Sequence, residues 1–165
     1  MSIVNGAVLD LTTRKPSEVS YRPFFKQTWE YRLNRSLSGG PLKVNGVAYE
    51  KGIATHSFTS LTFELGGKYS RFSAICGVDD SAADEGSVDF RVLLDGRVVY
   101  ESGVLKKGEQ SRVDLKLGDA KELVLETGFG GDDDIGDHGD WCVPRLIEDI
   151  AQAVRKLPVQ SPNGG

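Results

Sequence analysis

Apolar and polar residues alternate along most of the chain, and this period of two predicts β-strands with one buried face. The clearest runs place apolar residues at Leu61, Phe63 and Leu65; at Phe72, Ala74, Cys76 and Val78; at Val88, Phe90, Val92 and Leu94; and at Val113, Leu115 and Leu117. A shorter apolar run from Leu123 to Leu125 predicts a more fully buried strand. Short strands at intervals of about ten residues predict an all-β fold, an antiparallel β-sandwich or a barrel.

Two dipeptides typical of tight hairpin turns separate pairs of predicted strands: Asn45-Gly46 lies between Leu42–Val44 and Val47–Tyr49, and Asp95-Gly96 lies between Phe90–Leu94 and Arg97–Tyr100. Both dipeptides suit type I′ turns, in which two consecutive residues adopt positive φ. The sequence therefore predicts two β-hairpins with these turns.

A change of period near the C-terminus predicts one short helix, because Ile147, Ile150, Val154 and Leu157 recur at helical spacing before Pro158. The helix is expected either to dock on the sandwich or to begin a linker or oligomerisation helix of a longer protein. Three parts result: an extended N-terminal cover segment at 1–28, the sandwich at 29–145, and a C-terminal helix with a flexible tail at 146–165.

Composition places the chain among globular proteins, since its 165 residues are 39% hydrophobic and 27% charged. It contains no apolar run of membrane-spanning length, and its first twenty residues lack the pattern of a signal peptide. The part from Cys76 onward carries nineteen acidic and ten basic residues. Because nucleic acid requires a basic face, we expect no nucleic acid partner. Because no apolar run is long enough to span a bilayer, we expect no membrane partner either.

The two cysteines, Cys76 and Cys142, do not form a metal-binding or redox motif. They are either free thiols that behave as small buried apolar groups or a disulfide suited to an exported protein.

A segment rich in glycine and aspartate, Gly128 to Trp141, indicates a site or the scaffold of one. Its aspartates do not follow the EF-hand pattern, because a loop starting at Asp132 would end at Val143 instead of a glutamate. Carboxylates in irregular loops are nevertheless suitable calcium ligands. We therefore predict a structural Ca²⁺ held by Asp132, Asp134 and Asp137.

The chain contains none of the common nucleotide-binding or hydrolase motifs. It does contain carboxylates at Asp79, Asp80, Asp84 and Glu85 and again at Asp137 and Asp140. A glycosidase would need two of them facing each other at about 5 to 9 Å. Carboxylates in Gly- and Ser-rich loops are more often turn residues or metal ligands, so we predict that the domain is not an enzyme.

Three segments together resemble a known family. They are Asn45 to Ala74 with YxKGIxTHS, Gly77 to Ser81 with GVDD leading to Gly86 to Val104 with DGxxxYxSGV, and Asp137 to Trp141 with DHxDW. They resemble the NPCBM domain, or carbohydrate-binding module family 51, found in family 98 glycoside hydrolases. The resemblance covers about Trp29 to Arg145. It implies a jelly-roll β-sandwich of the galactose-binding-domain type, often with a structural calcium ion, that binds galactose-containing glycans without catalysis.

Sugar recognition requires an aromatic ring for the apolar C–H face and planar polar groups for the hydroxyls. The chain offers such groups at three predicted turns and two tryptophans: Trp29, Thr55, His56, Asp79, Asp80, Asp137, His138, Asp140 and Trp141. We expect these turns to meet at one end of the sandwich. Some of the residues would contact the ligand, and others would form a buried hydrogen-bonded scaffold.

The function predicted from sequence is that of a non-catalytic carbohydrate-binding module with a galactose-type glycan as its partner. The module would belong to a larger exported protein with further domains, located extracellularly or in the periplasm. Two alternatives remain: a protein-interaction or oligomerisation domain with a vestigial sugar site, and a small glycosidase.

Overall fold

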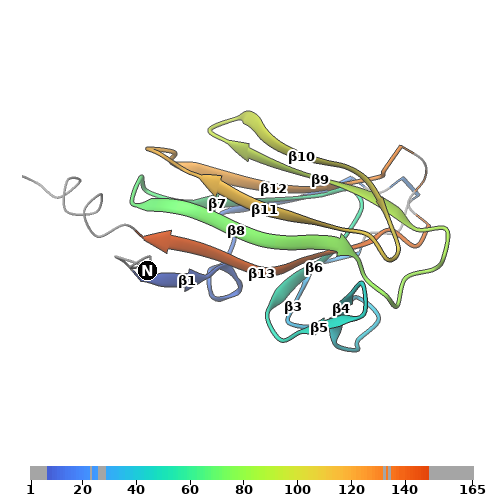
Figure 1. Cartoon of the computed structure of the whole chain (residues 1–165). Coiled ribbons are helices and arrows are strands. Elements are labelled where there is room, and N and C mark those ends of the chain that lie inside the picture. Colours follow the sequence, from blue (N-terminus) through green and yellow to red (C-terminus); the bar gives the residue numbers. More distant parts are fainter. Residues whose placement is uncertain (1–6, 23, 26–28, 132, 134, 149–165) are drawn as a thin grey trace, which may run out of the picture.

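The computed structural model describes residues 7–22, 24–25, 29–131, 133 and 135–148, and these form two antiparallel sheets and a separate hairpin (Figure 1). Sheet A has the order β11 (Gln110–Lys116), β8 (Tyr69–Val78), β13 (His138–Glu148), β6 (Gly52–His56), β3 (Arg32–Leu33), with β1 (Val8–Asp10) paired to β13. Sheet B has the order β10 (Arg97–Lys106), β9 (Ser87–Leu94), β12 (Glu122–Gly128), β7 (Thr59–Glu64), β2 (Glu18–Tyr21). The hairpin joins β4 (Leu42–Val44) to β5 (Val47–Tyr49), and a 3-10 turn, η1 (Leu11–Thr13), follows β1.

The core lies between the sheets and is built from the alternating apolar residues that predicted the strands. Phe63 and Phe90 of sheet B and Phe72 of sheet A are all buried. Trp141 of β13 is 0% exposed, and its ring meets that of Phe90 edge-on at a centroid distance of 5.0 Å. Its indole nitrogen donates a hydrogen bond of 3.1 Å to Thr127 Oγ1, so the polar atom of this large side chain is satisfied inside the core. The predicted all-β sandwich is confirmed.

Both predicted hairpins are present with the expected backbone. Asn45 and Gly46 have φ of 49° and 81°, and Asp95 and Gly96 have φ of 50° and 83°. The β9–β10 hairpin belongs to sheet B, whereas β4–β5 packs through Leu42 on the outer face of sheet A.

The ends of the described chain differ from expectation. The segment expected as a cover adds β1 to sheet A and β2 to sheet B. The C-terminal helix expected from residue 146 is wrong for Leu146–Glu148, which continue β13; residues 149–165 lie outside the described part. Leu146 is buried and lies between Phe72 of β8 and Leu9 of β1, so pairing on both sides overrides the helical spacing.

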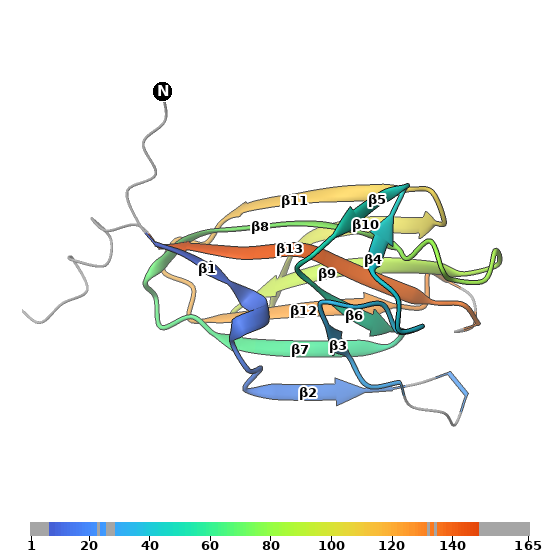
Figure 2. The ribbon, with the colours of Figure 1, turned by 90° about the horizontal axis from the view of Figure 1, so that it is seen from below.

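The described chain begins and ends at one end of the sandwich, where the Glu148 amide donates to the Ala7 carbonyl at 2.9 Å. At the opposite end lie the β6–β7, β8–β9 and β12–β13 connections and the segment after β2, which we call the loop end (Figures 1 and 2). No helix within the described residues has the length and apolar character needed to cross a membrane.

Truncating the central core residue should sharply lower stability. Trp141→Ala removes the contact with Phe90 and leaves a cavity, so we expect it to lower the free energy of unfolding by about 3–5 kcal/mol. Equilibrium urea denaturation measures the change, with Val98→Ala, at a site 47% exposed on β10, as the control. An unchanged midpoint for Trp141→Ala would show that the ring is not central to the core.

Candidate ligand-binding site

An exposed tryptophan rests on two histidines at the loop end. The register of sheet A places His56 of β6 directly opposite His138 of β13, with ring centroids 5.6 Å apart. Trp29 stacks on His56 at 5.4 Å and an interplanar angle of 15°, and it leans on His138 at 5.7 Å and 51°. Trp29 is 36% exposed, whereas His56 is buried. These three residues, the Trp29–histidine cluster, form a fixed and partly exposed aromatic surface.

His138 is the half-buried histidine of this cluster, and its imidazole lies beside the indole. Burial, reinforced by the neighbouring His56, lowers the pKa of His138, so its imidazole is neutral at pH 7. Nδ1 of His138 is buried and has no hydrogen-bond partner among the residues described. A neutral imidazole can both donate and accept a hydrogen bond, which suits recognition of hydroxyl groups.

Two of the predicted ligand contacts instead hold the loop end together. Asp137 is fully buried and accepts hydrogen bonds from Ser57 Oγ at 2.7 Å and the Ser87 amide at 3.0 Å. Thr55 Oγ1 is also buried, 2.7 Å from Thr127 Oγ1 and 2.6 Å from the Gly139 carbonyl. Their prediction as ligand contacts is corrected because neither side chain is accessible.

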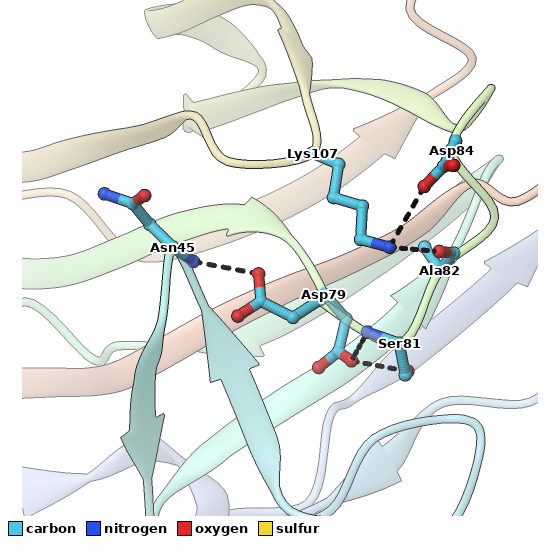
Figure 3. A network of polar contacts seen from close by, with 7 residues as sticks. Asn45, Asp79, Ser81, Ala82, Asp84 and Lys107 are labelled. Atoms are coloured by element: carbon cyan, nitrogen blue, oxygen red, sulfur yellow. Dashed lines mark hydrogen bonds and ion pairs between the residues drawn. The ribbon is translucent and has the colours of Figure 1, made fainter.

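The GVDD motif fastens the β4–β5 hairpin to sheet A. Asp79 accepts hydrogen bonds from the Ser81 amide at 2.9 Å and hydroxyl at 2.6 Å (Figure 3), and from the Lys43 amide at 3.2 Å. The Asp80 carboxylate accepts from the Asn45 and Gly46 amides at 3.1 and 2.9 Å. Asp79 is buried, so its prediction as a ligand contact is corrected; the half-buried Asp80 caps the hairpin turn.

The same β8–β9 connection is closed by Lys107 on the other side of the network. Its Nζ donates to the Ala82 carbonyl at 3.0 Å and lies 3.3 Å from Asp84 Oδ1 (Figure 3). Lys107 therefore links the β10–β11 turn to the β8–β9 connection.

Asp140 is buried beside Asp79 on the outer face of sheet A. Neither of its carboxyl oxygens has a hydrogen-bond partner among the described groups. Burial, together with Asp79, raises the pKa of Asp140 well above its ordinary value, so this group retains a proton at pH values where an exposed aspartate is ionised. Burial alone would raise the pKa of Asp79, but its contact with Asp140 and hydrogen bonds from Ser81 and Lys43 lower it. The prediction of Asp140 as a ligand contact is corrected, because the side chain is enclosed.

Trp141 requires the same correction. Its ring is wholly within the core and cannot stack on a sugar. Of the predicted ligand-binding residues, Trp29 and His138 stay partly exposed at one place. His56 is buried behind the indole, so its prediction as a ligand contact is corrected too.

The predicted calcium ligands are not gathered in the described part of the chain. Asp132 and Asp134 lie outside the described residues, and both oxygens of Asp137 already accept hydrogen bonds. Among described residues, no group of three or more His, Cys, Asp or Glu side chains is arranged to hold a metal.

The cysteines are free thiols, which confirms one of the two alternatives. Cys76 and Cys142 are both buried, and burial raises the pKa of the Cys76 thiol to about 12 and that of Cys142 further. Both are therefore protonated and unreactive at neutral pH.

Sequence reasoning missed a second group of aromatic residues at the loop end. Phe58 and Phe129 have ring centroids 6.3 Å apart, and the Arg22 guanidinium lies 4.3 Å from the centre of the Phe58 ring. Both phenylalanines line a hollow of about 300 Å³. Phe58 lies in the connection between β6 and β7, and Phe129 follows the end of β12. The periodicity of strands gives no signal for residues in such connections.

The β-sandwich and the aromatic residues at its loop end indicate the class of protein. A rigid sandwich presents aromatic rings at its loop end, while the conspicuous aspartates Asp79, Asp137 and Asp140 are buried in the scaffold. This arrangement is typical of a β-sandwich recognition module.

Comparison with known proteins gives the particular family, because residues 14–147 match the NPCBM/NEW2 domain. The chain belongs to the NPCBM/NEW2 domain family and is a carbohydrate-binding module, which confirms the resemblance and the predicted class of function. The CBM51 module of Clostridium perfringens GH95, solved with methyl-galactose, is 28% identical with a TM-score of 0.77, covering 85% of this chain and 99% of that one. The CBM51-2 and INT domains of Clostridium perfringens ZmpB, 23% identical with a TM-score of 0.77 over 86% of this chain and 32% of that one, share the fold.

Two curated relatives are much longer proteins. A putative endo-alpha-N-acetylgalactosaminidase of Renibacterium salmoninarum is 35% identical over 66% of this chain and 7% of its own length. Alpha-1,3-galactosidase B of Akkermansia muciniphila is 32% identical over 70% of this chain and 15% of its own length. The chain thus matches a small part of each.

The buried carboxyl of Asp140 predicts a pH-dependent effect of replacement. The folded protein holds a proton on Asp140 that the unfolded chain releases above about pH 4, so this group makes the free energy of unfolding fall as pH rises. Asp140→Asn cannot ionise and should therefore gain stability relative to the parent as pH rises from 4.5 to 7. Urea denaturation at both pH values measures the gain.

Asp84→Asn is the matched control, since its side chain is 96% exposed. It should show a smaller change with pH than Asp140→Asn. A stability difference between Asp140→Asn and the parent that stays constant or shrinks with pH would contradict the assignment.

Proposed function

We propose that this module binds a galactose-type sugar at the Trp29–histidine cluster. The observation that carries the proposal is the partly exposed Trp29 indole, held in a fixed plane by stacking on the buried His56. A module that is 28% identical to this chain, and that matches it over 99% of the module's own length, was solved with methyl-galactose. This similarity supports the class of sugar.

The chemistry of the cluster suits a shallow sugar site. His56 covers one face of the indole, and the exposed part of Trp29 can pack against the apolar C–H face of a sugar ring. The neutral imidazole of His138 stands beside the indole as a donor and acceptor for hydroxyls. A ring already locked in place loses little conformational entropy on binding.

We also infer the setting of the module. The two curated relatives carry glycosidase names and are far longer than the matched region. We propose that this chain serves a larger exported protein, extracellular or periplasmic, by holding an attached glycosidase close to its glycan.

The proposal predicts loss of sugar binding when the indole is removed. Wild-type protein should bind methyl galactoside with a Kd between about 1 mM and 1 μM, as expected for about 4 to 8 kcal/mol of binding free energy. Trp29→Ala should weaken binding by at least about tenfold, or about 1.4 kcal/mol. Isothermal titration calorimetry measures both.

Leu33→Ala is the control, because Leu33 is 40% exposed on β3, close to the exposure of Trp29, and pairs with Ile53, away from the histidines. It should bind like the wild type. Equal binding by Trp29→Ala and wild type would remove the cluster from the site, and no response of the wild type to any galactoside would refute the sugar class.

Calcium remains a proposal for the β12–β13 connection. We propose Asp132, Asp134 and Asp137, with backbone carbonyls, as the donors, since a carboxylate oxygen that accepts one hydrogen bond can still coordinate a cation. An ion that binds only the folded state at 100 times its Kd adds about 2.7 kcal/mol of stability. We therefore expect a higher Tm in CaCl₂ than in EDTA or MgCl₂, and loss of that difference in Asp132→Asn/Asp134→Asn. Identical Tm values in all three solutions would contradict calcium binding.

A further inference from the structure

A groove on the outer face of sheet B has no role in the site described above. It consists of two adjoining hollows that share Asp89, Arg91 and Gly131, with volumes of about 300 and 450 Å³. Phe58, Phe129 and Glu126 line the first, and Glu101, Gly103 and Val104 line the second. Both volumes fall in the range of ligand-binding pockets. We call this feature the sheet B groove.

The strand register brings its charged residues into one row. Because Val88, Phe90 and Val92 point into the core, Asp89 and Arg91 of β9 point outward. Arg91 pairs with Glu126 of β12 on one side and with Glu101 of β10 on the other. Its Nε lies 3.4 Å from Glu101 Oε1 and 3.6 Å from Asp89 Oδ2, so two carboxylates position the guanidinium.

A glycine-rich segment fixes the acidic side of the groove. Asp89 Oδ1 accepts a hydrogen bond from the Gly130 amide at 2.9 Å. A Cβ on Gly128 would lie 2.6 Å from that same oxygen, so the carboxylate can lie over this backbone only because residue 128 is glycine. Part of the Gly- and Asp-rich segment therefore orders a groove residue.

Aromatic rings close the groove toward the loop end. Phe129 contacts Phe58 and also Phe24, whose ring centroid is 5.8 Å away. Phe58 is separated by only Ser57 from His56, which supports Trp29. The β6–β7 connection thus carries Phe58 of the groove just after His56, where this connection joins sheet A to sheet B.

The lining indicates a neutral, hydroxyl-rich ligand. Three carboxylates, Asp89, Glu101 and Glu126, surround one guanidinium, which disfavours phosphate, sulfate and other anions. An apolar peptide would remove water from four charged side chains without offering them hydrogen bonds. Sugar hydroxyls can donate to the carboxylates and accept from Arg91, while C–H faces pack on Phe58 and Phe129.

We propose that the sheet B groove is a second saccharide subsite, which takes neutral sugar units of a longer glycan. The inference rests on the proposed function, since it extends that glycan. The module then recognises an oligosaccharide, and affinity increases with chain length.

The test compares one monosaccharide with longer glycans. A neutral glycan array identifies the galactose-terminated oligosaccharide that binds wild-type protein best, and calorimetry then gives its Kd and that of methyl galactoside. We expect the oligosaccharide to bind at least tenfold more tightly. Arg91→Ala and Phe129→Ala should each lose most of this advantage while keeping a methyl galactoside Kd within twofold of the wild type.

Arg71→Ala is the matched control, because Arg71 is a similarly exposed arginine paired with Asp114 on sheet A. It should retain the full advantage, and thermal melting verifies that every variant folds. The proposal is overturned if no neutral oligosaccharide exceeds methyl galactoside, or if both groove variants bind the oligosaccharide as the wild type does. Oligosaccharide binding that depends on Arg91, without any methyl galactoside binding, would support the groove and refute the site at Trp29.

Discussion

The burial of one strand, β13, between β6 and β8 is the constraint on which the binding end depends. Trp141 anchors this strand by packing on Phe90 and donating to Thr127 across the core. With position 141 facing inward, the alternation of a strand requires positions 138 and 140 to face outward. The residue that closes the core therefore also fixes where His138 meets His56 and Trp29.

Buried and half-buried carboxylates hold the connections between strands in place. Asp137 ties the β6–β7 turn to the start of β9, and Asp79 and Asp80 hold the β4–β5 hairpin against sheet A. Burying a charge is costly unless donors surround it, and backbone amides meet that need at each of these sites. Asp140 lacks such donors and is instead held in its neutral form. The acidic motifs of this molecule therefore mainly hold its loops in place instead of contacting a ligand.

The sequence allowed the regular parts of the fold to be predicted, because their signals are local. Alternation at Phe72 to Val78 and turn chemistry at Asp95-Gly96 depend only on neighbours along the chain. For His138 to Trp141 the sequence predicts a turn in a Gly- and Asp-rich segment, whereas pairing on both sides makes these residues part of a central strand. The row of Glu101, Arg91 and Glu126 depends on strand register, which no single segment reveals.

The joined positions of Ala7 and Glu148 have a mechanical consequence. Strand β8 spans the sandwich with ten residues, so the loop end lies about 30 Å from the end that holds Ala7 and Glu148. In the larger protein proposed above, a domain attached at that end would therefore be separated from a sugar at Trp29 by the length of the sandwich plus that of its linker.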